Sequence, residues 1–314
     1  MKEMNYAQFR DEVKASIKDY LTEDYQDYEM SFKTIKKSSG YEYEALMISP
    51  IGHEPSAIPA LNLEDAFERY QNGKSLEEIL YWLADIRMNA TIKDFNKEDM
   101  LHYDRIKDKI IPRLVNKAAN VEYLSDKPHQ NLDGLVDLSL FYAVRVSEDE
   151  EGCAEAVITN DLAEMWGIDA QELHEQAMKN NSQRTPLFKN LEDAIFGMGE
   201  PSYDIEDINP EDFRLPFFIL TAQRQNAKGA VMILNTNVMN RITAKLGDAV
   251  YIIPSSIHET LIVSKDHVDN LQDLVDMLEQ VNDNEVKPED RLSYNIYEYN
   301  SETGFKIANS KQVA

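Results

Sequence analysis

The sequence predicts an α+β (mixed α/β) protein of two lobes, in which mostly antiparallel strands or hairpins are packed by amphipathic helices. Three observations support this class. Apolar residues recur at helical spacing in several segments, and β-branched or aromatic runs flank short turns. The 314 residues also exceed the size at which a single core usually stops growing. We expect an N-terminal α+β lobe over residues 1–125 and a C-terminal α/β lobe with strand–helix–strand units over residues 126–314.

The N-terminal lobe begins with a predicted helix and a predicted hairpin. Apolar side chains recur every three or four residues from Tyr6 to Tyr20, which places them on one face of a helix. Asn5 and Gln8 are spaced as a capping pair at its start. Two aromatic and β-branched runs then flank "SSG", which indicates a hairpin over residues 28–49.

Helices are predicted for the rest of this lobe. The short segment "LEDAFERY" is separated by Gly73 from a longer amphipathic stripe, which Ser75 and Glu78 open as a capping box. Residues 96–124 carry apolar residues at helical spacing and predict a third helical region, with a kink or a break at Pro112.

The C-terminal lobe alternates predicted strands and helices. "LVDLSLFYAVRVS" and "AEAVIT" predict neighbouring strands across the acidic turn "EDEEG". A short helix from Asn160 to Gly167 follows, and Asp169 with Glu172 caps a longer one. The acidic stretch "FGMGEPSYDIEDINPEDF" lacks apolar periodicity and predicts a loop.

The remaining segments predict strands, helices and a final hairpin. "LPFFILTA" and "GAVMIL" are expected to pair as strands, and "NTNVMNRITAKLG" is expected to form a helix that ends at Gly247. "AVYII" and "ETLIV" predict further strands, and "DHVDNLQDLVDMLEQV" predicts a helix. "LSYNIYEYN" and "GFKIA" predict a hairpin around "SETG".

The charge of the chain restricts its partners. The 57 acidic and 32 basic residues give a formal net charge of -25. Such a field repels a phosphate backbone, because nucleic-acid binding relies on Lys and Arg. Direct binding to nucleic acid or to an anionic membrane is therefore not expected, whereas a basic partner is allowed. A second interpretation is that the excess charge only keeps the protein soluble.

The cellular setting is predicted from the cysteine count and from the hydropathy pattern. Cys153 is the only cysteine in the sequence, which excludes an internal disulfide and fits a reducing compartment. The first residues lack the apolar core of a secretory signal, and no apolar run approaches the ~20 residues of a membrane span. We therefore expect a cytoplasmic protein without a membrane segment.

Three segments carry a resemblance to known families: "LEDAFERYQNGKSLEEILYWL", "AVITNDLAEMWGIDAQELHEQAMKN" and "GDAVYIIPSSIHETLIVSKD". In this order they resemble an uncharacterised domain-of-unknown-function family of gut-dwelling anaerobic bacteria, over nearly the whole chain. A weaker similarity runs to the uncharacterised YtpQ-like proteins, where a basic–acidic pair is expected at the positions of Ser255 and Ser256. The resemblances imply an α/β or α+β fold and bring no activity, ligand or catalytic residue.

The polar turn "PSSIHETLIV" holds the candidate catalytic residues. Ser255, Ser256 and His258 are candidate nucleophiles and base, because a catalytic serine needs an adjacent base and that base needs an orienting acid. Asp248 and Glu259 are the candidate orienting acids. However, no "GxSxG" motif precedes the serines, and Ser and Pro are ordinary turn residues whose hydroxyls bond nearby backbone groups. The competing interpretation is a hairpin turn without a catalytic set.

No metal site and no cofactor are expected. A zinc-protease helix needs a second histidine four residues after the first, and none of the three His–Glu pairs in the sequence provides it. Their i+4 positions are Ala57, Met178 and Ile262. The eleven glycines are scattered, so no phosphate-binding loop is expected.

Three functions are compatible with these observations. The first is a non-enzymatic acidic binding or regulatory module with an unknown protein partner. Its candidate partner surfaces are the Tyr- and Glu-rich hairpins "YEYEALMI" and "YNIYEYN". The competing interpretation of both segments is a half-buried edge hairpin without a partner. The second function is a hydrolase that uses Ser255 or Ser256 with His258. The third is an acidic mimic of nucleic acid.

Overall fold

The structure is a computed structural model that divides into two compact units. It describes residues 4–51, 58–89, 97–148, 153–196, 202–222 and 228–309. The first unit comprises Met1–Lys37 and Tyr41–Lys97, and the second comprises Ser38–Gly40 and Glu98–Ala314. The expectations for the His–Glu pair at His53 and for the acidic turn at residues 149–152 lie outside the described residues.

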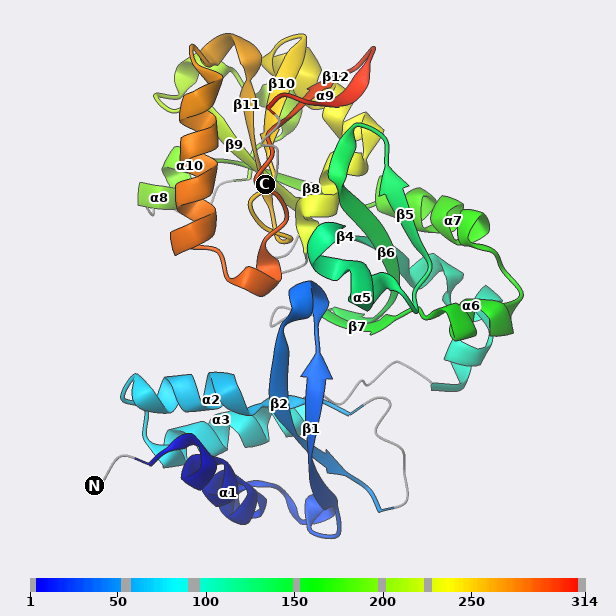
Figure 1. The fold of residues 1–314 in the computed structure, drawn as a ribbon, viewed down its shortest axis with the longest axis vertical. Coiled ribbons are helices and arrows are strands. Elements are labelled where there is room, and N and C mark those ends of the chain that lie inside the picture. Colours follow the sequence, from blue (N-terminus) through cyan, green and yellow to red (C-terminus); the bar gives the residue numbers. More distant parts are fainter. Residues whose placement is uncertain are drawn as a thin grey trace. The chain divides into compact units, whose positions relative to one another are not determined.

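The first unit packs helices against a small antiparallel sheet of order β1-β2-β3 (Figure 1). Its elements are α1 (Tyr6–Ser16), η1 (Ile17–Tyr20), η2 (Glu23–Tyr25), β1 (Glu29–Lys36), β2 (Glu42–Ser49), β3 (Leu61–Asn62), α2 (Leu63–Gln71) and α3 (Leu76–Asn89). The predicted helices and the predicted hairpin are therefore confirmed. The capping pair is confirmed too, because the Asn5 side chain accepts from the Gln8 N–H at 3.0 Å.

Strand β2 divides the apolar side chains of the first unit between its two faces. Successive residues of a strand point to opposite faces. Leu46 and Ile48 join the helices in the main core, together with Phe9, Val13, Ile17, Leu80 and Leu83. The residues at the odd-numbered positions of β2 form a smaller cluster on the opposite face: Tyr43, Ala45 and Met47.

The second unit contains a four-stranded antiparallel sheet centred on the long strand β6. Its strands are β4 (Ile110–Asn116), β5 (His129–Leu132), β6 (Leu135–Glu148) and β7 (Cys153–Val157). The short helices that precede or connect them are η4 (Lys97–Leu101), α4 (Tyr103–Ile106), η5 (Lys107–Lys109), η6 (Ala118–Asn120) and α5 (Val121–Leu124). The two strands predicted around "EDEEG" are confirmed as β6 and β7, which pair antiparallel.

The helical prediction for residues 96–124 is wrong at its centre, where β4 forms. The run from Ile110 to Val115 is buried on both faces, and such a run does not distinguish a buried strand from a buried helix. Pro112 lies opposite Tyr142 in the β4–β6 ladder. Proline is tolerated there because β4 is an edge strand of its sheet.

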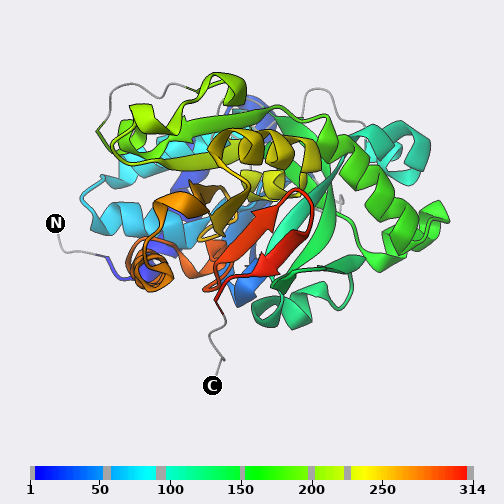
Figure 2. The ribbon, with the colours of Figure 1, turned by 90° about the horizontal axis from the view of Figure 1, so that it is seen from above.

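The second unit also contains a six-stranded antiparallel sheet of order β13-β12-β10-β11-β9-β8. Its strands are β8 (Pro186–Asn190), β9 (Phe217–Ala222), β10 (Ala249–Ile253), β11 (Thr260–Ser264), β12 (Tyr297–Asn300) and β13 (Gly304–Ile307). Figure 2 shows the red hairpin β12–β13 at one side of this sheet, away from the green strands β8 and β9. The predicted final hairpin is confirmed.

Helices cover both faces of the six-stranded sheet. The larger helices of this unit are α6 (Asn160–Trp166), α7 (Ala170–Ser182), α8 (Leu191–Phe196), α9 (Thr236–Leu246) and α10 (Leu271–Asn284). Val250 and Ile252 of β10 pack in one cluster with residues of α9. Tyr251 and Ile253 pack in another cluster with α10, on the opposite face.

The segment "GAVMIL" is not a strand, and its predicted pairing with "LPFFILTA" is wrong. It forms the 3₁₀ helix η9 (Gly229–Leu234). The N–H groups of Gly229 and Ala230 donate to the carbonyls of His258 and Ile257, at 2.8 and 3.2 Å. A side chain at Gly229 would collide with the end of β9 at Thr221, so only glycine allows this approach. The run is apolar because Gly229 to Ile233 are all buried.

The α+β class with antiparallel sheets is confirmed. The boundary expected between residues 125 and 126 falls inside the second unit, because β4 pairs along its length with β6. Among the residues that the structure describes, no helix has the length and apolar character needed to cross a membrane.

Candidate functional site

The predicted catalytic turn connects β10 to β11, as the sequence indicates. Ser256 Oγ accepts a hydrogen bond from the His258 N–H at 3.1 Å, which is a local turn contact between side chain and backbone. Across the described residues, no hydrogen bond joins the hydroxyl of Ser255 or Ser256 to the imidazole of His258. The turn interpretation therefore accounts for the contacts of Ser256.

The imidazole of His258 faces an acid that the sequence analysis did not select. Its Nε2 lies 3.4 Å from Asp290 Oδ1, with the two side chains 33% and 27% exposed. Its Nδ1 is buried and has no hydrogen-bond partner among the described residues. The candidate orienting acids are placed differently: the Asp248 carbonyl accepts from Asn300 next to the start of β10, and Glu259 is exposed.

Asp290 reaches His258 through pairing between segments distant in sequence. The Ile257 N–H donates to the Asp290 carbonyl at 2.8 Å, and the Leu292 N–H donates to the Ser255 carbonyl at 3.1 Å. Ser256 and Arg291 also form an isolated antiparallel bridge. No local pattern in "DNEVKPED" predicts this pairing, so the sequence alone does not indicate that Asp290 lies beside His258. The catalytic role of Ser255, Ser256, His258 and Glu259 stays a prediction.

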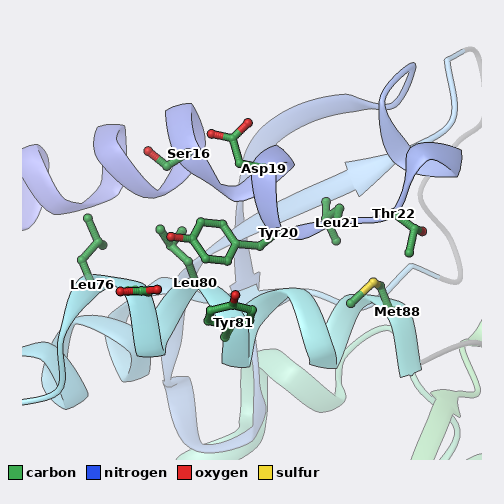
Figure 3. A pocket seen from close by; sticks show the side chains of 10 residues that line it. Ser16, Asp19, Tyr20, Leu21, Thr22, Leu76, Leu80, Tyr81 and Met88 are labelled. Carbon is green, nitrogen blue, oxygen red and sulfur yellow. The ribbon is translucent and has the colours of Figure 1, made fainter.

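A groove in the first unit is the second candidate site. It lies between the segment around η1 and the length of α3, and its cavity volume is about 750 Å³ (Figure 3). Its apolar lining comes from Leu21, Leu76, Leu80 and Met88. Its polar lining comes from Ser16, Asp19, Thr22 and Glu77. Tyr20 and Tyr81 complete it, one from each wall.

The local fold explains why these side chains face the groove. Helix α1 ends at Ser16 and continues as the tighter η1, in which Ile17 is fully buried and anchors the turn. On α3, residues four apart lie on the same face, so Leu76 with Leu80 and Glu77 with Tyr81 form two adjacent rows. Leu80 belongs to the core, and the row beside it remains open to solvent.

Two tyrosines meet across the groove. The ring centroids of Tyr20 and Tyr81 are 4.8 Å apart at an interplanar angle of 87°, an edge-to-face contact. Figure 3 shows Tyr20 reaching from η1 toward α3, where Tyr81 lies. Tyr81 is 61% exposed although it is a large aromatic residue. The groove is thus walled by aromatic surface that water can reach.

The electrostatic character of the groove is negative. Burial first, then the charge of Glu77, then Tyr81 and last Asp19 raise the pKa of Tyr20 above its ordinary value. Both carboxylates are exposed, and within the described chain neither has a Lys, Arg or His partner at ion-pair distance. Nearby acids differ, since Glu78 pairs with Lys74 at 3.1 Å and Asp11 pairs with Arg10 at 2.9 Å.

The second unit contains a buried charge cluster whose charges are satisfied internally. Arg113 and Glu155 are 2% and 8% exposed, and the guanidinium Nε lies 3.1 Å from each carboxylate oxygen. Lys228 Nζ lies 3.4 Å from Glu155 Oε2. Burial opposes ionisation of Glu155, yet these cations outweigh it and lower the pKa of that carboxyl to about 2. This mutual pairing indicates a structural role for the cluster.

No metal centre is found in the described part of the chain, where no group of three or more His, Cys, Asp or Glu side chains is arranged to hold an ion. The groove was missed in the sequence because Tyr20 continued the apolar face of the first predicted helix. The one available signal was Tyr81, a large aromatic residue that lies beside the Leu76, Ile79, Leu80 and Leu83 stripe rather than in it.

Comparison with known proteins places the chain in a family. Residues 6–301 match the model of Family of unknown function (DUF5688), so the chain belongs to that family. No curated protein matches the chain. No solved structure matches it either. The expected origin in gut anaerobes and the expected similarity to YtpQ-like proteins stay predictions.

Proposed function

We propose that the protein is a non-enzymatic binding or regulatory module of the cytoplasm, and that the groove of its first unit is where a partner protein binds. The observation that carries this proposal is the Tyr20–Tyr81 pair on an open groove. Tyrosine is enriched among the residues that dominate binding energy at protein interfaces. Tyr81 exposes most of its surface, so it is available to a partner.

The construction of the groove supports binding without a large rearrangement. Its floor residue Leu80 is buried in the core of the first unit, and Ile17 anchors the opposite wall. A site that is already formed avoids part of the cost of ordering side chains on association. The cavity volume is about 750 Å³, within the roughly 300–1,000 Å³ of small-molecule pockets, so the groove has room for side chains of a partner.

The test compares the wild type with a Tyr20→Ala/Tyr81→Ala variant as bait in native lysate. We expect a stoichiometric partner that the wild type retains and the variant loses, because truncating anchor residues costs more than about 1 kcal/mol each. Ile51→Ala is the control, since Ile51 is a 64% exposed apolar residue of the same unit outside the groove. Equal retention by all three proteins, with intact folds by circular dichroism, would contradict the proposal.

A hydrolase remains the second candidate, in which Ser255 or Ser256 acts with His258. The observation that favours it is the approach of His258 Nε2 to Asp290 Oδ1 at 3.4 Å, since a carboxylate beside one ring nitrogen orients the imidazole. The serine would then have to reach the other nitrogen, Nδ1, which is the reverse of the usual triad arrangement. A panel of activated esters and amides tests it. Turnover that His258→Ala abolishes would support the hydrolase and count against a non-enzymatic module. The third hypothesis, a nucleic-acid mimic, rests on the net charge alone.

A further inference from the structure

We propose that the groove receives a lysine or arginine side chain from a basic segment of the partner protein. This inference rests on the proposed function, and it adds the chemistry that the groove recognises. It follows from three features of the described residues: two carboxylates without cationic partners, two tyrosine rings without a cation over them, and an apolar floor.

The first feature is charge complementarity. Asp19 and Glu77 line the same groove from opposite walls, Asp19 from η1 and Glu77 from α3. Within the described chain, no basic side chain reaches either carboxylate. A basic side chain entering the groove would meet negative charge from both walls. A neutral or acidic side chain would leave them unpaired or repelled.

The second feature is the state of the aromatic rings. A cation within about 6 Å of a ring centroid is attracted to the ring face. The first unit uses this contact repeatedly: Arg69 lies 4.1 Å over Trp82, Arg87 lies 4.6 Å over Tyr25, and Arg10 lies 4.9 Å over Phe32. In the described chain, by contrast, no cation of the protein itself lies over Tyr20 or Tyr81. No cation of the described chain therefore competes with an external cation for these rings.

The third feature is the apolar lining, which favours a protein side chain over a bare cation. Lysine and arginine carry methylene stems that pack on apolar surface while the charged head stays near water. Half-buried Leu76 provides such a surface on the α3 wall of the groove. The volume exceeds what one basic side chain fills, so an apolar neighbour in the same segment would occupy the remaining space.

A random peptide library displayed on phage is the probe that tests this inference. We expect peptides selected on the wild type to be enriched in Lys or Arg next to an apolar residue. For a selected peptide, Asp19→Asn/Glu77→Gln should weaken binding about tenfold, since two exposed charge pairs are lost while the tyrosine rings remain. The matched control is Asp27→Asn/Glu68→Gln, which removes two exposed carboxylates of the same unit outside the groove. The control should bind within about twofold of wild type.

The outcomes separate this inference from the function on which it rests. Selected peptides that lose binding in Tyr20→Ala/Tyr81→Ala but contain no Lys or Arg would overturn the inference and leave the groove as a binding site. Peptides that bind this variant as well as the wild type would overturn both. Equal weakening by the groove pair and by the control pair would also overturn the inference, because the net charge alone would then explain the preference.

Discussion

Arg113 and Glu155 show how single residues in this protein depend on one another. Arg113 lies opposite Phe141, and Glu155 lies opposite Arg145, so the pair reaches diagonally across β6 over the small Ala143. Both side chains are almost fully buried. A buried ion pair is weak evidence for stability, but removal of one partner leaves an uncompensated charge in the interior.

The first prediction concerns this pair. Glu155→Gln should lower the free energy of unfolding by about 3–5 kcal/mol, because the Arg113 guanidinium loses its carboxylate while it stays buried. Urea denaturation of the purified variant measures this change. Glu122→Gln is a suitable control, since Glu122 is an exposed acid of the same unit and should cost less than about 0.5 kcal/mol. A loss below about 1 kcal/mol for Glu155→Gln would refute a buried, mutually dependent pair.

The same carboxyl predicts a pH dependence. Its pKa in the folded protein is about 2, below the ordinary value of 4.5, so its stabilisation is complete above pH 4.5 and is lost as the pH falls toward 2. The shift corresponds to about 3 kcal/mol at neutral pH. Unfolding of wild type and Glu155→Gln should therefore be compared at pH 7 and near pH 3. The stability gap between them should narrow at the lower pH, and a constant gap would contradict this origin.

Gly134 carries the second residue-scale constraint. It has a φ of +76°, and a Cβ at this position would meet the backbone carbonyl oxygen of Phe305. We expect Gly134→Ala to destabilise the protein by more than about 2 kcal/mol, because backbone must shift in addition to the cost of the left-handed conformation. Gly73 provides the matched comparison, with a φ of +96° and no atom within 4 Å.

Gly73→Ala should therefore cost only the conformational part, about 1 kcal/mol. Thermal unfolding of the two variants side by side measures the difference. Similar losses for both would mean that the approach of Phe305 to Gly134 is not a constraint.

At the scale of elements, local sequence signals predicted most of the helices. They failed where a segment's structure depends on contacts with distant parts of the chain or where both of its faces are buried. The capping residues Asn5, Ser75 and Asp169 mark three helices that the structure contains. β4 was missed because its residues are buried on both faces, so the apolar spacing that separates a strand from a helix is absent. η9 was missed because its hydrogen bonds go to the Ile257–His258 segment, which no local pattern reveals.

The candidate sites were likewise predictable only where they depend on local sequence. The turn at Ser255 and Ser256 was predictable, because Pro and Ser mark a turn between two apolar runs. Its acidic neighbour Asp290 was not, since it arrives through pairing with a segment more than thirty residues away. The groove depends on the approach of η1 to α3, which lie in one unit but far apart in sequence. Sequence periodicity identifies the face of a helix, and it does not identify what lies opposite that face.

Asp137 links the two sheets of the second unit. We therefore expect its substitution to lower the free energy of unfolding. From β6, its carboxylate accepts from Ser293 Oγ at 2.6 Å, from Asn295 Nδ2 at 2.9 Å and from the Tyr297 hydroxyl. Burial and the negative charge of Asp137 raise the pKa of Tyr297, so Tyr297 stays a donor.

Asp137→Asn replaces one acceptor oxygen by a donor, which conflicts with these three donors. We expect a loss of about 2–3 kcal/mol in the free energy of unfolding, measured in urea. Asp133→Asn, in the same hairpin and exposed, is the control and should be nearly neutral. An unchanged free energy of unfolding in Asp137→Asn would show that the contact between the sheets does not depend on this carboxylate.

At the scale of the whole molecule, the net charge of -25 and the local charges of the groove act on different steps of binding. A field of one sign attracts a basic segment over a distance and raises the rate of encounter, and salt screens this effect. Asp19 and Glu77 act only after contact, because they lie at the groove itself. The two contributions should therefore separate in the kinetics of binding.

For a basic peptide selected on the groove, we expect the association rate to fall steeply with added salt in the wild type and in every variant. Asp19→Asn/Glu77→Gln should mainly accelerate dissociation, because contact charges hold the bound peptide. Asp27→Asn/Glu68→Gln, with the same change in net charge, should leave dissociation unchanged. Stopped-flow or surface-based kinetics at low and high salt provide both rates. If the groove pair altered association alone, the net charge would explain the binding, and the groove would have no specific contact with the cation.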